Sequence, residues 1–169
     1  VKVDPATLRL TVHERGGRLV MADNADPVMR ADGSFELSFA MPVGERYFGL
    51  GDKTGPFDRR GASYVHWNTD TFGYGRETDP TYKSIPFYVT TGGGFGSYGL
   101  FLDNPTRSWF DFGHRSAGKL KIGAPDGPVD YYLIAGPMLS EVVQRYHGLT
   151  GTAPLIAPWG LGYQQSRYS

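Results

Sequence analysis

The sequence contains no cysteine. Disulfide bonds and thiolate metal sites are therefore excluded, but this absence fits a reducing or an oxidising compartment equally well and leaves the localisation open. Net charge is also lacking, because 17 basic residues balance 17 acidic residues and no overall field concentrates nucleic acid or anionic lipid. No apolar stretch approaches the roughly 20 residues needed to cross a bilayer. We therefore expect neither a nucleic-acid nor a membrane partner.

Motifs of metalloenzymes and acyl-transfer enzymes are also missing. The histidines at positions 13, 66, 114 and 147 are far apart, and none belongs to an H-x-x-x-H pattern. No G-x-S-x-G elbow is present. We expect no metal and no cofactor. Glycoside hydrolysis needs a pair of carboxyl groups, but the spacing of the 17 acidic residues selects no pair.

Short alternating segments separated by glycine and proline dominate the chain, whose 169 residues suit one main domain with a core. In residues 35–39, Phe35, Leu37 and Phe39 fall on one face and polar side chains on the other, as in a half-buried strand. Similar segments occur at 8–12, 18–21, 64–67, 86–91, 97–102, 107–112, 119–122 and 129–134. Their spacing predicts an antiparallel β-sandwich.

Besides the strand segments, the sequence predicts one hairpin turn and one helix. The run Gly92-Gly93-Gly94 between two strong strand segments predicts a hairpin turn. A phosphate-binding loop would open a helix there, whereas a strand pattern follows. A single helix is predicted over 137–147, where Val142, Val143 and Tyr146 share one stripe with residue 138 or 139, and Gly148 follows. We expect this helix to pack against the sandwich.

The last segment differs from the rest. Pro154 and Pro158 indicate a linker, and the apolar run 159–169 has the character of a strand with no partner after it. We expect this run to begin a second domain that continues beyond the chain.

A family resemblance rests on the dense stretch 45–88, ERYFGLGDKTGPFDRRGASYVHWNTDTFGYGRETDPTYKSIPFY, and on APLIAPWGLGYQQSRYS at the end. The pieces YFGLGDKTGP, WNTD and YKSIPFY closely resemble the amino-terminal sandwich of glycoside hydrolase family 31, which includes α-glucosidases and α-xylosidases. The final piece resembles the entry into that family's (β/α)8 barrel. The resemblance implies an all-β, galactose-mutarotase-like sandwich with one helix over 1–150, and a linker with the first barrel strand over 151–169.

The resemblance also implies how function is divided. In the family, a nucleophilic Asp and an acid/base Asp follow later barrel strands, so no catalytic residue is assigned in this chain and the isolated chain is expected to be inactive. Hydrolysis would be retaining, on an α-glucoside or α-xyloside, with the barrel of the same polypeptide as partner.

Two residues match substrate contacts of the family. Asp70 in the WNTD turn corresponds to a loop aspartate that binds sugar hydroxyls, a task that suits a carboxylate; the alternative is that it merely caps the turn before Thr71. Tyr168 corresponds to an aromatic residue after the first barrel strand that covers the face of the sugar; the alternative is ordinary barrel packing.

Other residues near these positions are given lesser roles. The aromatic side chains of Trp67, Phe72 and Tyr74 are assigned to the core rather than to a rim around the sugar. The pairs Arg59-Arg60 and Asp52-Lys53 are assigned to interdomain contacts or solvated turns.

Three alternative functions stay open. One is a stand-alone carbohydrate-binding module, and another is a purely structural domain that shapes the barrel mouth. The third is a mutarotase-like epimerase, which would need a Glu and a His converging on one sugar.

Overall fold

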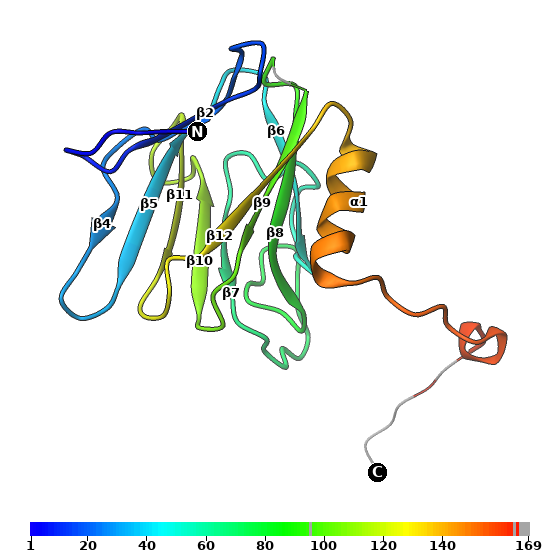
Figure 1. Cartoon of the computed structure of the whole chain (residues 1–169). Coiled ribbons are helices and arrows are strands. Elements are labelled where there is room, and N and C mark those ends of the chain that lie inside the picture. Colours follow the sequence, from blue (N-terminus) through cyan, green and yellow to red (C-terminus); the bar gives the residue numbers. More distant parts are fainter. Residues whose placement is uncertain (95, 164, 166–169) are drawn as a thin grey trace.

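Two antiparallel sheets pack face to face in the computed structural model, which describes residues 1–94, 96–163 and 165 (Figure 1). The first sheet has the order β4-β5-β11-β10-β7 and the second the order β12-β9-β8-β6. In the first sheet the strands are β4 (Val28–Met29), β5 (Phe35–Ala40), β7 (Ser63–His66), β10 (Ser108–Phe112) and β11 (Lys119–Ala124). In the second they are β6 (Arg46–Gly51), β8 (Ser84–Thr91), β9 (Ser97–Leu102) and β12 (Tyr131–Gly136). The predicted all-β sandwich is confirmed.

Alternation of side chains along each strand fills the space between the sheets. On β8, Tyr88 is fully buried in the main core, while its neighbour Phe87 faces the opposite side of the sheet. The tilted contact between Tyr47 and Phe112, at 5.1 Å between ring centroids, joins the two sheets. Each strand segment predicted from the sequence overlaps an observed strand.

The prediction omitted three strands. Two of them, β1 (Lys2–Val3) and β4, have only two residues each. The third, β6, does not alternate regularly, because its pairing with β8 shifts register between Gly49 and Gly51. Its buried residues Tyr47 and Leu50 are therefore three positions apart rather than two. A bulge of this kind removes the period by which a strand is found.

A small sheet covers one end of the sandwich. It consists of β1, β2 (Leu10–His13) and β3 (Leu19–Ala22), in that order. Asp23 ties it to the large sheet through a bridge to Phe39, and the Asp23 carboxylate accepts a 2.7 Å bond from the Leu10 amide.

The helix α1 (Leu139–Thr150) lies on the outer face of the second sheet (Figure 1). Val142 is fully buried, and the ring of Tyr146 stacks on Phe87 at 3.8 Å between centroids. The predicted packing is therefore confirmed, but the predicted bounds 137–147 were wrong. The helix runs through Gly148 and ends at Thr150. Gly151, with a φ of 86° and a 2.8 Å bond from its amide to the His147 carbonyl, forms the C-terminal cap.

The predicted hairpin at Gly92–Gly94 is confirmed, since β8 pairs with β9 on either side of it. The segment after α1 extends away from the sandwich (Figure 1). Its residues Pro158–Leu161 form a 3-10 helix, so the predicted strand is wrong over that part. Proline at the first position fixes φ near −65° and removes an amide, which suits a helical turn. No helix among the described residues is both long and apolar enough to cross a membrane.

Candidate functional site

The long loop 67–83, which joins β7 to β8, carries the WNTD turn and forms the candidate site. It lies at the lower edge of the sandwich in Figure 1. Loops on a rigid sheet commonly carry binding groups, because the sheet fixes their ends.

Hydrogen bonds fix the backbone around Asp70. The polar residues on either side of Asp70 each form a hydrogen bond with the part of the chain that leads back into β8. These bonds run from the Ser84 amide to Asn68 Oδ1 (2.8 Å), from the Thr69 amide to the Thr81 carbonyl (3.0 Å) and from Thr71 Oγ1 to the Pro80 carbonyl (2.9 Å). Asp70 itself is exposed. The turn is therefore rigid while its carboxylate faces solvent.

The carboxylate of Asp70 is not used to cap the turn. Within the described part of the chain it makes no hydrogen bond and no ion pair, whereas Thr71, the residue it was to cap, bonds instead to carbonyl groups. This leaves both carboxylate oxygens available to a ligand. The other predicted contact, Tyr168, lies outside the described residues, so the structure does not bring the two together.

A buried ion pair anchors the loop to the sheets. The Lys53 ammonium, whose side chain is fully buried, lies 2.9 Å from Asp79 Oδ1 and also donates to the Val65 carbonyl and to Ser84 Oγ (3.4 Å). The second Asp79 oxygen accepts the Val65 amide. Burial lowers the pKa of Lys53, and the adjacent Asp79 opposes that shift. We call Lys53, Val65, Asp79 and Ser84 the Lys53 anchor. These residues join β7, the second half of the loop and the start of β8.

The glycine bulge of β6 places Lys53 in the anchor. Leu50 adopts a positive φ of 77° between Gly49 and Gly51, and its side chain is fully buried. A Cβ on Gly51 would lie 2.6 Å from the Lys83 carbonyl, and one on Gly49 2.7 Å from the Phe87 carbonyl. Only glycine fits these approaches. The two glycines of GLGDK are thus explained by the close approach of β6 to two backbone carbonyls, that of Phe87 in β8 and that of Lys83 at the end of the loop.

Lys53, Arg59 and Arg60 make contacts within the sandwich, which corrects their sequence-based assignment to solvated turns. Arg59 is 6% exposed and donates to the carbonyls of Thr54 (3.1 Å) and Pro56 (2.8 Å). Arg60 donates to the Glu45 carbonyl at 2.8 Å. Guanidinium groups suit this task because they offer several donors in a fixed plane. Of the predicted pairs, only Asp52 is solvated.

The aromatic residues of the loop are exposed, so their assignment to the core was wrong. Trp67, Phe72 and Tyr74 are 51%, 94% and 58% exposed. The core is filled instead by aromatic residues of the strands, such as Tyr88 and Phe110. Amino-acid composition cannot distinguish the exposed aromatic residues of the loop from the buried aromatic residues of the strands. Exposed aromatic side chains gathered on one loop are typical of a binding surface.

A pocket of about 320 Å³ lies where the loop meets the sheets. It is lined by His66, Trp67, Asn68, Ser84, Pro86, Asn104, Pro105, Thr106 and Ser108. His66 is 5% exposed, and its ring meets Phe110 edge to face at 4.6 Å. Burial, with a smaller effect of Lys53, lowers the pKa of His66 to about 3. The imidazole is therefore neutral at physiological pH.

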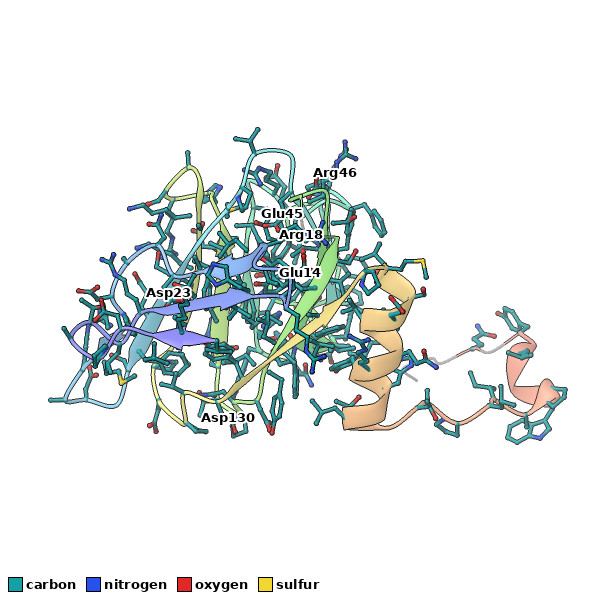
Figure 2. The ribbon with its side chains drawn as sticks, turned by 45° about the horizontal axis from the view of Figure 1, so that its top comes forward. Glu14, Arg18, Asp23, Glu45, Arg46 and Asp130 are labelled. Carbon is teal, nitrogen blue, oxygen red and sulfur yellow. The ribbon has the colours of Figure 1, made fainter. Side chains whose placement is uncertain are left out.

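A second buried ionisable group, Glu45, was not singled out by the sequence. It is 3% exposed and accepts hydrogen bonds from the hydroxyls of Tyr47 and, at 3.4 Å, Tyr98. Burial raises the pKa of Glu45, and these two hydroxyls partly offset the shift. Figure 2 turns the end of the sandwich that carries Glu45 toward the reader.

Glu45 and His66 do not form an epimerase pair. Glu45 lies against Gly93 in the turn after β8, whereas His66 lines a pocket with Ser84, the first residue of β8. The length of β8 separates them, roughly 23 Å at about 3.3 Å per residue. One sugar cannot contact both groups, so this pair gives no support to the epimerase alternative.

Comparisons with known proteins agree with one another. A family model described as the glycosyl hydrolase 31 N-terminal galactose mutarotase-like domain matches residues 1–111. Alpha-glucosidase 2 of Bacillus thermoamyloliquefaciens is 34% identical over 180 residues, covering 100% of this chain and 23% of that protein. An alpha-xylosidase of Saccharolobus solfataricus is 30% identical, covering 95% of this chain and 23% of its own length.

A solved structure gives the same result. The family 31 dextranase of Flavobacterium johnsoniae in complex with glucose matches with a TM-score of 0.81 and 35% identity, over 92% of this chain and 19% of the dextranase. A mutant of the same dextranase has been solved in complex with isomaltotriose. This chain therefore spans about a quarter or less of the length of these relatives.

Breaking the Lys53 anchor is expected to destabilise the fold. Lys53→Met leaves Asp79, whose side chain is 16% exposed, without its cation, and we expect the free energy of unfolding to fall by about 3 kcal/mol. Lys83→Met is the matched control, because the Lys83–Asp52 pair has side chains 61% and 59% exposed and is worth under about 1 kcal/mol. Urea denaturation measures both. If both variants lose the same free energy of unfolding, the Lys53–Asp79 pair contributes no more to stability than an exposed ion pair.

His66 is expected to make the fold sensitive to mild acid. Its pKa of about 3 lies below the value of about 6.5 in the unfolded chain, so the unfolded state binds more protons between these values. Stability is therefore complete above about pH 6.5 and falls as the pH drops toward 3, by up to about 1.4 kcal/mol per pH unit from this group.

Urea denaturation between pH 7 and pH 5 measures this contribution, since few carboxylates titrate there. His66→Phe should flatten the profile over this range. His147→Phe, on the exposed side of α1, controls for the removal of a histidine and should keep the wild-type profile. An unchanged slope in His66→Phe would contradict a buried neutral imidazole.

Proposed function

The chain belongs to glycoside hydrolase family 31, and from this we propose that it serves an enzyme that cleaves α-glycosidic bonds with retention of configuration. Its part is that of the amino-terminal galactose mutarotase-like domain. The printed names of the similar proteins, an α-glucosidase, an α-xylosidase and a dextranase, support an α-glucoside or α-xyloside as substrate.

We propose that residues 151–169 lead into a (β/α)8 barrel of the same polypeptide, which carries the catalytic carboxylates. The small share of each relative that this chain covers supports this proposal. So does the exposure of the apolar side chains after α1, since such a group normally lies against a partner. These are Leu155 (100%), Ile156 (66%), Trp159 (87%), Leu161 (73%) and Tyr163 (89%).

Asp70 is the observation that carries a direct role in substrate binding. Its carboxylate has no internal partner among the described residues, and the turn that holds it is fixed by three hydrogen bonds. A carboxylate held in this way can accept two hydroxyl protons of a sugar in charge-assisted bonds. The fixed position of this exposed carboxylate supports a contact to sugar over the role of a purely structural domain.

Tyr168 is proposed as a second contact on the strength of its sequence alone. Its ring would cover the apolar C–H face of the sugar that is cleaved, and its hydroxyl would donate a hydrogen bond. Tyr168→Phe separates the two parts, because it retains the ring and removes the donor.

The proposed activity is tested by assaying two proteins. The full natural polypeptide is expected to hydrolyse an aryl α-glucoside or an aryl α-xyloside, whereas the 169-residue chain should release no aglycone. The initial product should have the α configuration, which proton NMR of the anomeric signal detects. Turnover by the 169-residue chain alone would overturn the division between sandwich and barrel.

The role of Asp70 is tested by Asp70→Asn in the full polypeptide. Loss of the charged acceptor should lower kcat/KM about 10- to 100-fold, the range expected for hydrogen bonds to a charged group. Glu77→Gln, an exposed acid on the same loop, is the control and should leave kcat/KM unchanged. If Asp70→Asn retains the wild-type kcat and KM, the sandwich only shapes the barrel mouth and does not touch sugar.

A further inference from the structure

A pocket of about 310 Å³ opens on the first sheet, where β5 and β10 begin and β11 and β7 end. This is the sheet that α1 does not cover (Figure 1). The volume is at the lower end of the range for small-molecule sites, which suits a ligand of about one ring. No acidic residue in the described part of the chain lines the pocket. Its lining includes Arg30, Val65, Arg107, Trp109, Ala124 and Pro125.

We propose that this pocket binds the carboxylate group of a small organic acid and holds the rest of the ligand against an apolar wall. Aromatic acids and acidic sugars share this chemistry. The pocket contains no residue of loop 67–83, and the proposal does not depend on the hydrolytic activity proposed above.

Two guanidinium groups supply the charge for an anionic ligand. Arg30 belongs to the turn between β4 and β5, and Arg107 directly precedes β10, so the strand β11 lies between their two strands. Arg107 is exposed and makes no hydrogen bond or ion pair with any described residue. Arg30 donates only a 3.5 Å bond, to Ser34 Oγ. Both groups therefore retain donors for a carboxylate, which guanidinium groups bind with two parallel bonds.

The acidic residues beside the pocket bond to their own turns. Asp32 Oδ1 accepts the Ser34 amide at 3.0 Å and the Ser34 hydroxyl at 2.7 Å. These bonds, with a smaller effect of Arg30, lower the pKa of Asp32. Asp126 Oδ1 accepts the Gly127 amide at 2.7 Å. Because these two carboxylates offset part of the positive charge, a singly charged carboxylate suits the pocket better than a phosphate group, whose charge is close to −2.

The indole of Trp109 forms a fixed wall of the pocket. A Cβ on Gly123 would lie 2.5 Å from Trp109 Cζ2, so the ring lies directly against the backbone of β11. The guanidinium carbon of Arg115 lies 5.7 Å from the ring centroid. With these two neighbours over the ring, its edge is left to face the pocket. The edge of an aromatic ring is electropositive, which favours a carboxylate oxygen.

Fluorine NMR of a small probe tests the site in the full natural polypeptide. The signal of 4-fluorobenzoate should broaden on binding, whereas that of 4-fluorobenzamide, which has the same shape and no charge, should stay sharp. Arg107→Gln is expected to raise the Kd of 4-fluorobenzoate at least about tenfold, because it removes hydrogen bonds to a charged group. Arg30→Gln should act in the same direction. Arg15→Gln is the control, since this exposed arginine lies in the turn between β2 and β3, outside the pocket.

Competition against 4-fluorobenzoate identifies the kind of acid. Stronger displacement by glucuronate than by benzoate assigns the site to acidic sugars, and the reverse order assigns it to aromatic acids. Stronger displacement by inorganic phosphate than by either acid would overturn the assignment to carboxylates. An unbroadened probe, equal broadening of the amide, or an unchanged Kd in both Arg107→Gln and Arg30→Gln would overturn the site itself. Each readout is binding, so absence of hydrolytic activity leaves this test unaffected.

Discussion

The buried contact between Lys53 and Asp79 is the constraint on which the candidate site depends. A buried ion pair gains little net stability over apolar packing, but it holds its groups in one arrangement because each charge needs its partner. Here the pair also binds both the amide and the carbonyl of Val65. One set of contacts therefore holds the loop at Val65 in β7, at Asp79 within the loop and at Ser84, the first residue of β8.

The outer face of the second sheet and the edge that carries loop 67–83 are held by different kinds of contact. The second sheet is covered by α1, whose Tyr146 stacks on Phe87, so its outer face is closed by apolar packing. The edge that carries loop 67–83 is instead held by polar contacts, which leave aromatic rings and a carboxylate in solvent. Apolar packing supplies stability at one place, and directional bonds supply a fixed shape at the other.

Much of the fold follows from periodicity, and much of the site does not. The segment 97–102, in which Tyr98, Leu100 and Leu102 recur at every second position, was predicted with the right bounds. The strand β6 was missed because the bulge at Gly49 and Gly51 interrupts its period. The sequence pointed to Asp70 through a family motif. It could not show that Lys53 is buried or that Phe72 is exposed, because both depend on which segment of the chain passes beside them.

The ionisable groups of the domain fall into two sets with different uses. Glu45 and His66 are buried, have shifted pKa values and lie at opposite ends of β8, so they cannot share one substrate. Asp70 and Asp52 are exposed on or beside the anchored loop. Acid–base catalysis needs two groups with perturbed pKa values in one cleft, whereas sugar recognition needs charged acceptors at fixed positions. The distribution of these groups supports our proposal that this domain binds sugar for a catalytic centre located elsewhere.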